Sequence, residues 1–338
     1  MKRLLRRFFP IGLAIALLFY ALKDSSLTDI GAQFRQANYR WLVLTGILIA
    51  LYNVVRAARW QLTLQAIGYQ PSLYRATIAV LAGTMASLIV PGAGELTRCG
   101  TLQRTDNIPV AHGFGSVVAE RVIDLLMLGI LIGLTLLVEF KRIGHYFFEL
   151  LSPVISRATS INYTGLLTGF ITFGFLLAVF FYWLFQQKTF RQHTVLIKLV
   201  SLFGNIGQGF MSIRKLQQPG LFASLTLVSY LLIYLTTYSL FFASYKTIYL
   251  PPTAALSIIT ISSLGGMAVP TQGGLGTYHY LVSRVLLLYG LPKDESIAMA
   301  TFMHAVQTGF ALLFSSLSFL IVPVLIRKKN SRINEPMV

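Results

Sequence analysis

Long runs of apolar residues, separated by short polar connections, form the dominant pattern of the chain. We interpret six of these runs as membrane-spanning helices, because most of them approach or exceed the roughly 20 apolar residues that cross a bilayer. They extend over Phe8–Leu22, Trp41–Ala58, Val117–Phe140, Thr164–Phe185, Leu221–Ser244 and Ser296–Ile326. The first run follows a cluster of basic residues and lacks a small-residue cleavage site behind it. We therefore expect a retained signal anchor with a cytoplasmic N-terminus.

Three further apolar runs are short for a span: Ala76–Val90, Thr253–Val269 and Tyr278–Tyr289. Two of them end in the same motif, V-P-x-x-G-x-L, at Val90–Leu96 and at Val269–Leu275. Because proline ends a helix and glycine permits a tight turn, the motif predicts two re-entrant hairpins, with a kinked span or a surface loop as the alternative. The residues of the two hairpin turns are Pro91, Gly92, Gly94, Pro270, Gly273, Gly274 and Gly276.

Together these segments predict an all-α polytopic membrane protein with six full spans plus two re-entrant hairpins. From a cytoplasmic N-terminus, each half of the chain is ordered span, span, hairpin, span, and the two halves have opposite orientations. This order predicts inverted 3+3 repeats, the first at about 1–140 and the second at about 164–326. They form a single integral membrane domain, 1–326, before a short basic cytoplasmic tail, 327–338. Lys and Arg are more numerous on the predicted inner connections than on the outer ones, which favours this orientation.

Composition supports a membrane protein and excludes several other classes. Only 12% of the residues are charged, against about 25% in soluble domains, and 55% are hydrophobic. A soluble globular enzyme, a disordered chain and a coiled coil are therefore excluded. The net charge of +17 is best explained by basic residues that flank membrane spans, so we expect no nucleic-acid partner. A single cysteine, Cys99, and the absence of His, phosphate-loop or dinucleotide motifs predict no disulfide, no metal site and no cofactor.

Ionisable residues within or beside the apolar segments are the candidate functional residues, because a charge at the bilayer centre costs about 2.5–3.5 kcal/mol. Most belong to the first half: Arg56, Arg59, Glu95, Arg98, Glu120, Arg121 and Asp124, with Arg284 in the second half. Four arginines against three carboxylates give the first-half cluster a net charge of +1. The cluster is either a structural ion-pair network or a polar cavity for an anionic head group, which arginine binds bidentately. For Arg56 and Arg59 alone, snorkelling to the interface beside an anchoring Trp60 is an equal alternative.

The second hairpin is less charged and offers polar side chains and exposed backbone N–H groups. Gln272 and His279 are candidate head-group ligands, and the glycine-rich turn could form an anion nest. His304 lies on the last span, where a lone buried histidine is more often structural than functional.

Four short motifs occur in order along the chain: R-x-x-R-W at Arg56–Trp60, P-G-x-G-E-x-x-R at Pro91–Arg98, E-R-x-x-D at Glu120–Asp124 and P-x-x-G-G-L-G at Pro270–Gly276. With these motifs the chain resembles the flippase-like family of the lysylphosphatidylglycerol synthase transmembrane region, over nearly its whole length. The resemblance implies a stand-alone membrane module without the soluble aminoacyl-transfer domain. In the family pattern an acidic residue follows the last glycine by three places, where this chain has His279.

The resemblance and the charged cluster together suggest a flippase-like protein that moves or presents an anionic phospholipid or lipid-linked intermediate across the inner membrane. Its partners would be membrane lipids, and both termini would be cytoplasmic. Two other functions remain open. One is a membrane-embedded glycosyl or acyl transferase that acts on a lipid carrier, with a carboxylate of the cluster as general base. The other is a non-catalytic partner subunit of a lipid-modifying enzyme.

Overall fold

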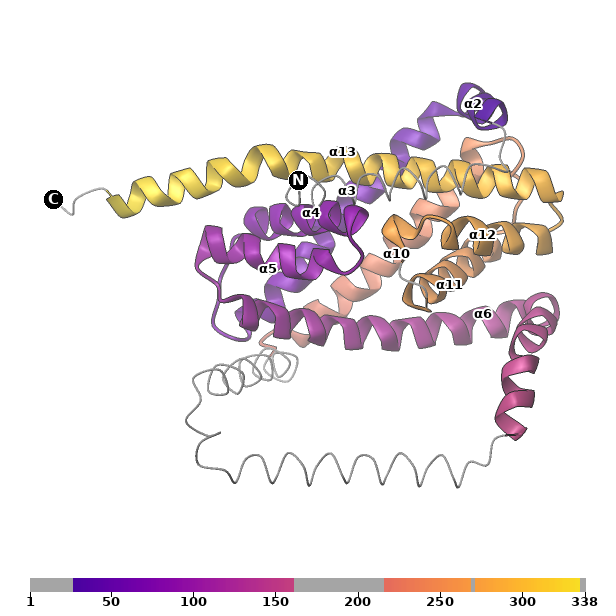
Figure 1. The fold of residues 1–338 in the computed structure, drawn as a ribbon, viewed down its shortest axis with the longest axis horizontal. Helices are drawn as coiled ribbons and strands as arrows, with labels where there is room; N and C mark the ends of the chain where they lie inside the picture. Colours follow the sequence, from indigo (N-terminus) through magenta and orange to yellow (C-terminus); the bar gives the residue numbers. More distant parts are fainter. Residues whose placement is uncertain (1–26, 161–215, 269–270, 335–338) are drawn as a thin grey trace, which may run out of the picture.

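Helices account for all the regular secondary structure that the computed structural model describes, which covers residues 27–160, 216–268 and 271–334 (Figure 1). No strand occurs in these ranges. The elements are α2 (Leu27–Gln36), α3 (Tyr39–Gln65), α4 (Leu73–Ile89), α5 (Ala93–Asp106), α6 (Val110–Ser160), α10 (Pro219–Ala243), α11 (Pro252–Ala268), the 3-10 turn η2 (Gln272–Gly274), α12 (Thr277–Leu288) and α13 (Lys293–Asn334). The predicted spans 8–22 and 164–185 lie outside the described residues.

Four of the described helices are long and apolar enough to cross a membrane: α3, α10, the part of α6 before Phe140, and α13 up to Arg327. They contain four of the six predicted spans. Three of them extend well beyond the predicted bounds. Helix α3 continues past Ala58 to Gln65. Helix α6 continues to Ser160 after a kink at Glu139, where φ is −113° and ψ is 25°. Helix α13 continues through part of the predicted basic tail and ends at Asn334.

The three short apolar runs form α4, α11 and α12, and the more polar segment after Gly92 forms α5. Each V-P-x-x-G motif therefore joins two short helices, as predicted. Helices α4 and α5 have 17 and 14 residues, α11 and α12 have 17 and 12, and the members of each pair pack against each other. Each pair turns at glycines in the left-handed region, with φ of 76° at Gly92 and 80° at Gly276. A side chain bearing a Cβ would be strained in this conformation, which explains why both motifs are rich in glycine.

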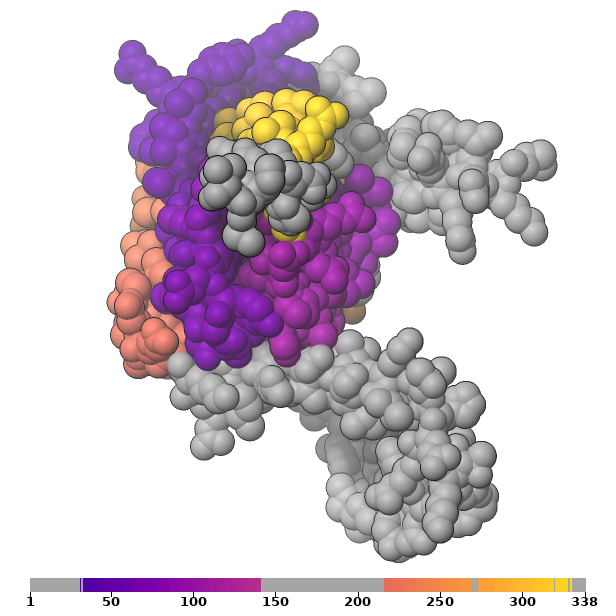
Figure 2. Space-filling view, turned by 90° about the vertical axis from the view of Figure 1, so that its left-hand side faces the viewer, coloured from indigo at the N-terminus to yellow at the C-terminus, as the bar shows by residue number. Residues whose placement is uncertain are grey.

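The two hairpins lie between α13 on one side and α6 on the other (Figure 1). Helix α13 packs against α4 and α12, while α6 packs against α5 and α11. Helices α3 and α10 form the most extensive contact between two helices, and Figure 2 shows salmon-coloured α10 against the indigo and violet α3. The two run antiparallel at this contact, because the N–H of Asn38, which precedes α3, donates to the carbonyl of Ala243 at the end of α10 at 2.9 Å.

Hydroxyl groups connect helices that are otherwise apolar. Thr45 of α3 and Ser239 of α10 share a hydrogen bond of 2.8 Å, and so do Thr135 of α6 and Thr260 of α11. In a membrane, an apolar side chain gains no hydrophobic free energy when it leaves the lipid for a neighbouring helix. Hydrogen bonds and close packing therefore hold the helices together. The amphipathic helix α2 was not expected from the sequence. It lies beside α13, where Phe34 meets Phe302 edge to face with ring centroids 5.0 Å apart.

The two arms of the first hairpin approach each other closely at Gly83 of α4 and Gly94 of α5. A Cβ on Gly94 would lie 2.5 Å from the Gly83 carbonyl oxygen and 2.1 Å from the hydroxyl oxygen of Ser87. A Cβ on Gly83 would in turn lie 2.7 Å from the Gly94 carbonyl oxygen. The two arms can therefore cross at this distance only if both positions are glycine.

We expect the Gly94→Ala variant to unfold at lower temperature than the wild type, because the added methyl group must push the two backbones apart. Overpacking of this kind costs about 1–3 kcal/mol. Thermal unfolding of the purified protein in detergent measures the effect. Gly129→Ala is the matched control, because a Cβ there meets nothing within 4 Å and alanine favours a helix by up to about 1 kcal/mol over glycine. Equal melting temperatures for the two variants would contradict the close crossing.

Candidate functional site

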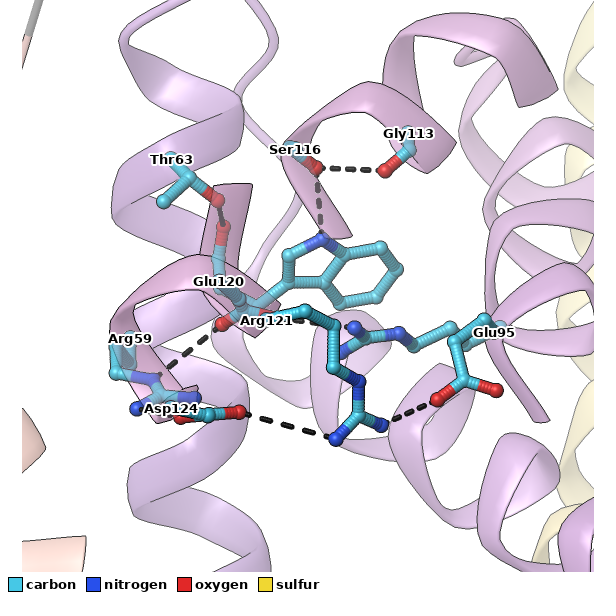
Figure 3. A network of polar contacts seen from close by, with 10 residues as sticks. Arg59, Thr63, Glu95, Gly113, Ser116, Glu120, Arg121 and Asp124 are labelled. Carbon is cyan, nitrogen blue, oxygen red and sulfur yellow. Dashed lines mark hydrogen bonds and ion pairs between the residues drawn. The ribbon is translucent and has the colours of Figure 1, made fainter. Parts of the chain in front are cut away.

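Glu120 of α6 lies at the centre of a buried ion-pair network that joins three helices (Figure 3). Its Oε1 lies 3.4 Å from Nε of Arg59 on α3, and its Oε2 lies 3.0 Å from Nη2 of Arg98 on α5. The exposed fractions of the three side chains are 2%, 4% and 3%. One carboxylate therefore neutralises part of two guanidinium charges, and it fixes the first hairpin to the two neighbouring spans.

Arg121, the next residue of α6, and Asp124, one turn beyond Glu120, extend the network toward a more open region. Asp124 lies 2.9 Å from Nη1 of Arg59 and 3.8 Å from Nη1 of Arg121, and Arg121 also pairs with Glu95 at the start of α5. The Arg121 side chain is 52% exposed. The network thus has a buried part around Glu120 and an accessible part around Arg121. The predicted proximity of Asp124 to Arg121, from their spacing of three residues, is confirmed.

Trp60 belongs to the interior of this site. Its side chain is fully buried, its Nε1 donates to Oγ of Ser116 at 2.9 Å, and its ring lies 4.6 Å from Cζ of Arg98. The interpretation of Trp60 as an interfacial anchor is therefore wrong, and the buried Arg59 does not snorkel. The face of an indole ring attracts a cation, so Trp60 partly replaces the hydrogen bonds that Nε and Nη1 of Arg98 lack among the described residues.

Arg56 differs from the other three arginines, because it forms no ion pair with any residue that the structure describes. The three carboxylates of the cluster are all paired with Arg59, Arg98 or Arg121. The surplus positive charge counted in the sequence can therefore be assigned to Arg56. Its side chain is half-buried and lies one turn before Arg59 on α3.

Two cavities meet at the accessible part of the network. One, of about 280 Å³, lies against the first hairpin and is bordered by Arg98, Glu95 and Gly94. The other, of about 310 Å³, lies between α3, α6, α10 and α11. The residues that border both cavities are Tyr52, Arg56, Arg121 and Asp124. The unpaired charge of Arg56 thus faces both spaces.

The second cavity has a polar and an apolar side. The apolar side includes Leu128, Leu131, Ile233 and Met267. Met267 is 56% exposed on the surface of the described helices. The cavity therefore combines a basic end with an apolar wall that reaches the outside of the helix bundle.

The second hairpin borders both cavities: Ser263, Gly266 and Met267 of α11 border the larger one, and Gly273 of its turn borders the smaller one. His279, predicted as a head-group ligand, borders neither cavity and instead accepts a hydrogen bond from the N–H of Gly276. Gln272 lies in the turn η2. Sequence reasoning missed Tyr52, which has no charge and no motif to distinguish it from the many other tyrosines of the chain.

Comparison with known proteins identifies a family. The sequence profile of the family described as "Lysylphosphatidylglycerol synthase TM region" matches residues 7–315, which include both hairpins and the whole charged cluster. A curated protein of Methanocaldococcus jannaschii described as a "UPF0104 membrane protein" is 33% identical to the chain over 90 residues. This alignment covers 26% of the chain and 27% of the relative. No solved structure matches the chain.

We expect Glu120→Gln to destabilise the protein strongly, because it leaves Arg98 without a carboxylate in a buried position. Removing one partner of a buried ion pair typically costs about 3–5 kcal/mol. Thermal unfolding and the yield of monodisperse protein in detergent measure the loss. Glu95→Gln is the matched control, since its partner Arg121 is half exposed and such pairs contribute about 0–1 kcal/mol. If the control lost as much stability as Glu120→Gln, the buried carboxylate would not be the centre of the network.

Proposed function

Because the chain belongs to the family of the lysylphosphatidylglycerol synthase transmembrane region, we propose that this multi-pass membrane protein moves or presents an anionic phospholipid or lipid-linked intermediate across the inner membrane. The observation that carries the proposal is the position of Arg56. It is the one arginine of the cluster without a carboxylate partner among the described residues, and it borders both cavities. An anionic head group would supply the missing counter-charge.

Two other arginines near Arg56, Arg121 and Arg98, could also bind an anionic head group. Arg121 can turn toward a ligand because its side chain is half exposed, and Glu95 and Asp124 would hold it in the absence of one. Arg98 borders the smaller cavity and retains two nitrogens without hydrogen-bond partners among the described residues. Phosphate oxygens accept several such donors at once, as guanidinium groups require.

The shape of the larger cavity favours a lipid over a free anion. A head group at Arg56 and Arg59 would leave its acyl chains beside Leu128, Leu131 and Met267, toward the outside of the bundle. The chains would then stay in hydrocarbon while the charged group moves along the shared wall of the two cavities. This arrangement avoids the cost of carrying the whole molecule through a polar channel.

We also propose that the fold consists of two inverted halves around this site. The pairing of helices supports it: α3 with α4 corresponds to α10 with α11, and α5 with α6 corresponds to α12 with α13. The ends of the helices agree, since Lys246 near the end of α10 pairs with Glu295 at the start of α13, whereas Lys329 near the other end of α13 contacts the end of α5. In this arrangement hairpin α4–α5 opens inside and α11–α12 opens outside.

We expect Arg56→Gln to slow lipid transport without unfolding the protein. Loss of one charged hydrogen-bond donor to phosphate costs about 1.5–3 kcal/mol, which is about 10- to 150-fold in affinity. The assay uses proteoliposomes with fluorescent phosphatidylglycerol, and fluorescent phosphatidylcholine serves as a zwitterionic comparison. Arg284→Gln is the control, because Arg284 lies over the exposed ring of Tyr280 on α12, away from both cavities.

Transport that is equal in Arg56→Gln and in the wild type would contradict a head-group site at Arg56. Consumption of a glycosyl or acyl donor by the purified protein would favour the transferase instead. If neither transport nor turnover occurred until a lipid-modifying enzyme was added, the protein would be a partner subunit.

We expect single cysteines at Gln103 and Lys293 to be labelled from opposite sides of the membrane. Both positions are exposed, at the end of α5 and the start of α13. The background variant is Cys99→Ser, since Cys99 is the single native cysteine. A membrane-impermeant maleimide, added to intact and to permeabilised cells, distinguishes the two sides. Labelling of both sites from one side would exclude the inverted arrangement.

A further inference from the structure

Two buried imidazole rings that play no part in the charged cluster lie beside the turn of the second hairpin. His279 lies in the first turn of α12 and His304 lies on α13, with exposed fractions of 9% and 6%. Their ring centroids are 4.7 Å apart and the rings are nearly perpendicular, at 79°. Each ring binds a backbone group of the glycine-rich turn that connects α11 to α12.

The backbone partners define where the protons of the two rings lie. The N–H of Gly276 donates to Nδ1 of His279 at 3.3 Å, so this nitrogen carries no proton and the ring is neutral. The carbonyl oxygen of Gly273 lies 2.8 Å from Nε2 of His304, so this nitrogen carries the proton that the carbonyl accepts. His304 can therefore gain a second proton at Nδ1 and keep its bond, whereas His279 would lose its bond.

His279 is the side chain that ties the turn to α12. It occupies the third position of the helix, from which a glutamate or glutamine commonly reaches back to the N–H of the capping residue. The capping residue here is Gly276, which has no side chain of its own to cap the helix. A proton on Nδ1 of His279 would place two N–H groups face to face, and the start of α12 would separate from the turn.

Few groups around the pair could neutralise an added proton. His304 faces His279 from α13, and Tyr278 stacks on His304 with ring centroids 4.9 Å apart, its hydroxyl accepting from Gln307. Helix α11 contains no titratable residue and α12 contains no carboxylate. On the far side of the turn are the charged residues that border the smaller cavity: Arg56, Glu95, Arg98, Arg121 and Asp124. Because two adjacent imidazolium ions repel each other, the pair takes up one proton at a time.

The turn held by the two rings is also a wall of the smaller cavity. Gly273 borders that cavity, and a Cβ on Gly273 would lie 3.1 Å from the side chain of Leu88 on α4. A displacement of the turn therefore changes the space next to Arg98. With both rings neutral, the turn keeps both bonds, and a proton on Nδ1 of His279 would remove one of them.

We propose that His279 and His304 form a proton-binding site that controls the position of the second hairpin turn and, through Gly273, the shape of the cavity beside Arg98. The controlling step is binding of a proton at Nδ1 of His279, which converts the neutral imidazole to an imidazolium ion and breaks the bond between His279 and Gly276. A proton that binds only at Nδ1 of His304 leaves both bonds to the turn in place. The effect on lipid movement rests on the function proposed above, whereas the movement of the turn does not.

The test measures access to the cavity in the full-length protein without added substrate. A cysteine replaces Thr84, which borders the smaller cavity on α4, in a Cys99→Ser background. Its reaction rate with an aromatic disulfide that stays reactive in acid is followed from about pH 8 to about pH 4. This range starts above the ordinary histidine pKa of about 6.5 and extends well below it, because burial disfavours the charged form of a ring. The same cysteine in a His279→Asn protein provides the reference, because the asparagine oxygen can accept from Gly276 but takes up no proton.

The reaction rate of the cysteine in the protein that retains His279 is divided by its rate in the His279→Asn protein. We expect this ratio to rise about threefold or more on acidification, as for a two-state shift toward an open turn. The division removes the pH dependence of the thiol itself. His112→Asn is the control: His112 bonds to the hydroxyl of Tyr69 far from the hairpin, and this variant should keep the rise. A constant ratio would overturn the proposal.

Two further measurements keep the result interpretable. If His279→Asn does not fold, His279→Gln replaces it, since the glutamine amide oxygen can also accept from the N–H of Gly276 and does not titrate. Transport of fluorescent phosphatidylglycerol is measured separately. A rising ratio in a protein that moves no lipid would support the proton site and contradict the proposed function. Lipid transport together with a constant ratio would contradict the proton site and support the proposed function.

Discussion

The sharing of one buried carboxylate by two arginines determines how the first half of the molecule is assembled. A charge alone in the hydrocarbon layer costs about 2.5–3.5 kcal/mol, so Arg59, Arg98 and Glu120 are tolerated only together. Each comes from a different helix, and their meeting holds the first hairpin between two spans. One carboxylate cannot neutralise two guanidinium groups. Asp124 supplies a second negative charge beside Arg59, and the face of the Trp60 ring stabilises the charge of Arg98.

Apart from this network, the helices are held by short-range contacts. The crossing of Gly83 and Gly94 brings two backbones together, and single hydroxyl pairs connect α3 to α10 and α6 to α11. Such contacts depend on distance far more steeply than charge pairs do. The charges therefore select which helices associate, and the small residues determine how closely they approach.

Local sequence patterns predicted the features that depend on neighbours along the chain. Proline and glycine located both hairpins, and a spacing of three residues indicated the contact of Arg121 with Asp124. Partners far apart in the sequence could not be assigned. The choice of Glu120 by Arg59 and Arg98 depends on how three helices meet, and Trp60 is buried because Ser116 arrives from another helix. His279 did offer a local signal, because it follows the capping Gly276 by three residues.

Helix α13 acts as a rod that touches both hairpins. It contacts α12 near its start and α4 further along, and at its far end Nζ of Lys329 donates to the carbonyl oxygen of Arg104 at 2.9 Å and to Oδ1 of Asn107 at 2.6 Å. Pro323 lies before that last contact, and its missing N–H leaves a carbonyl one turn earlier without its helical partner. Helix α13 therefore has no proline where it packs against α12 and α4, and it can bend between these contacts and its bonds to the end of α5. Forces on the basic end of the helix would be absorbed as bending at the proline before they reached the hairpin turns.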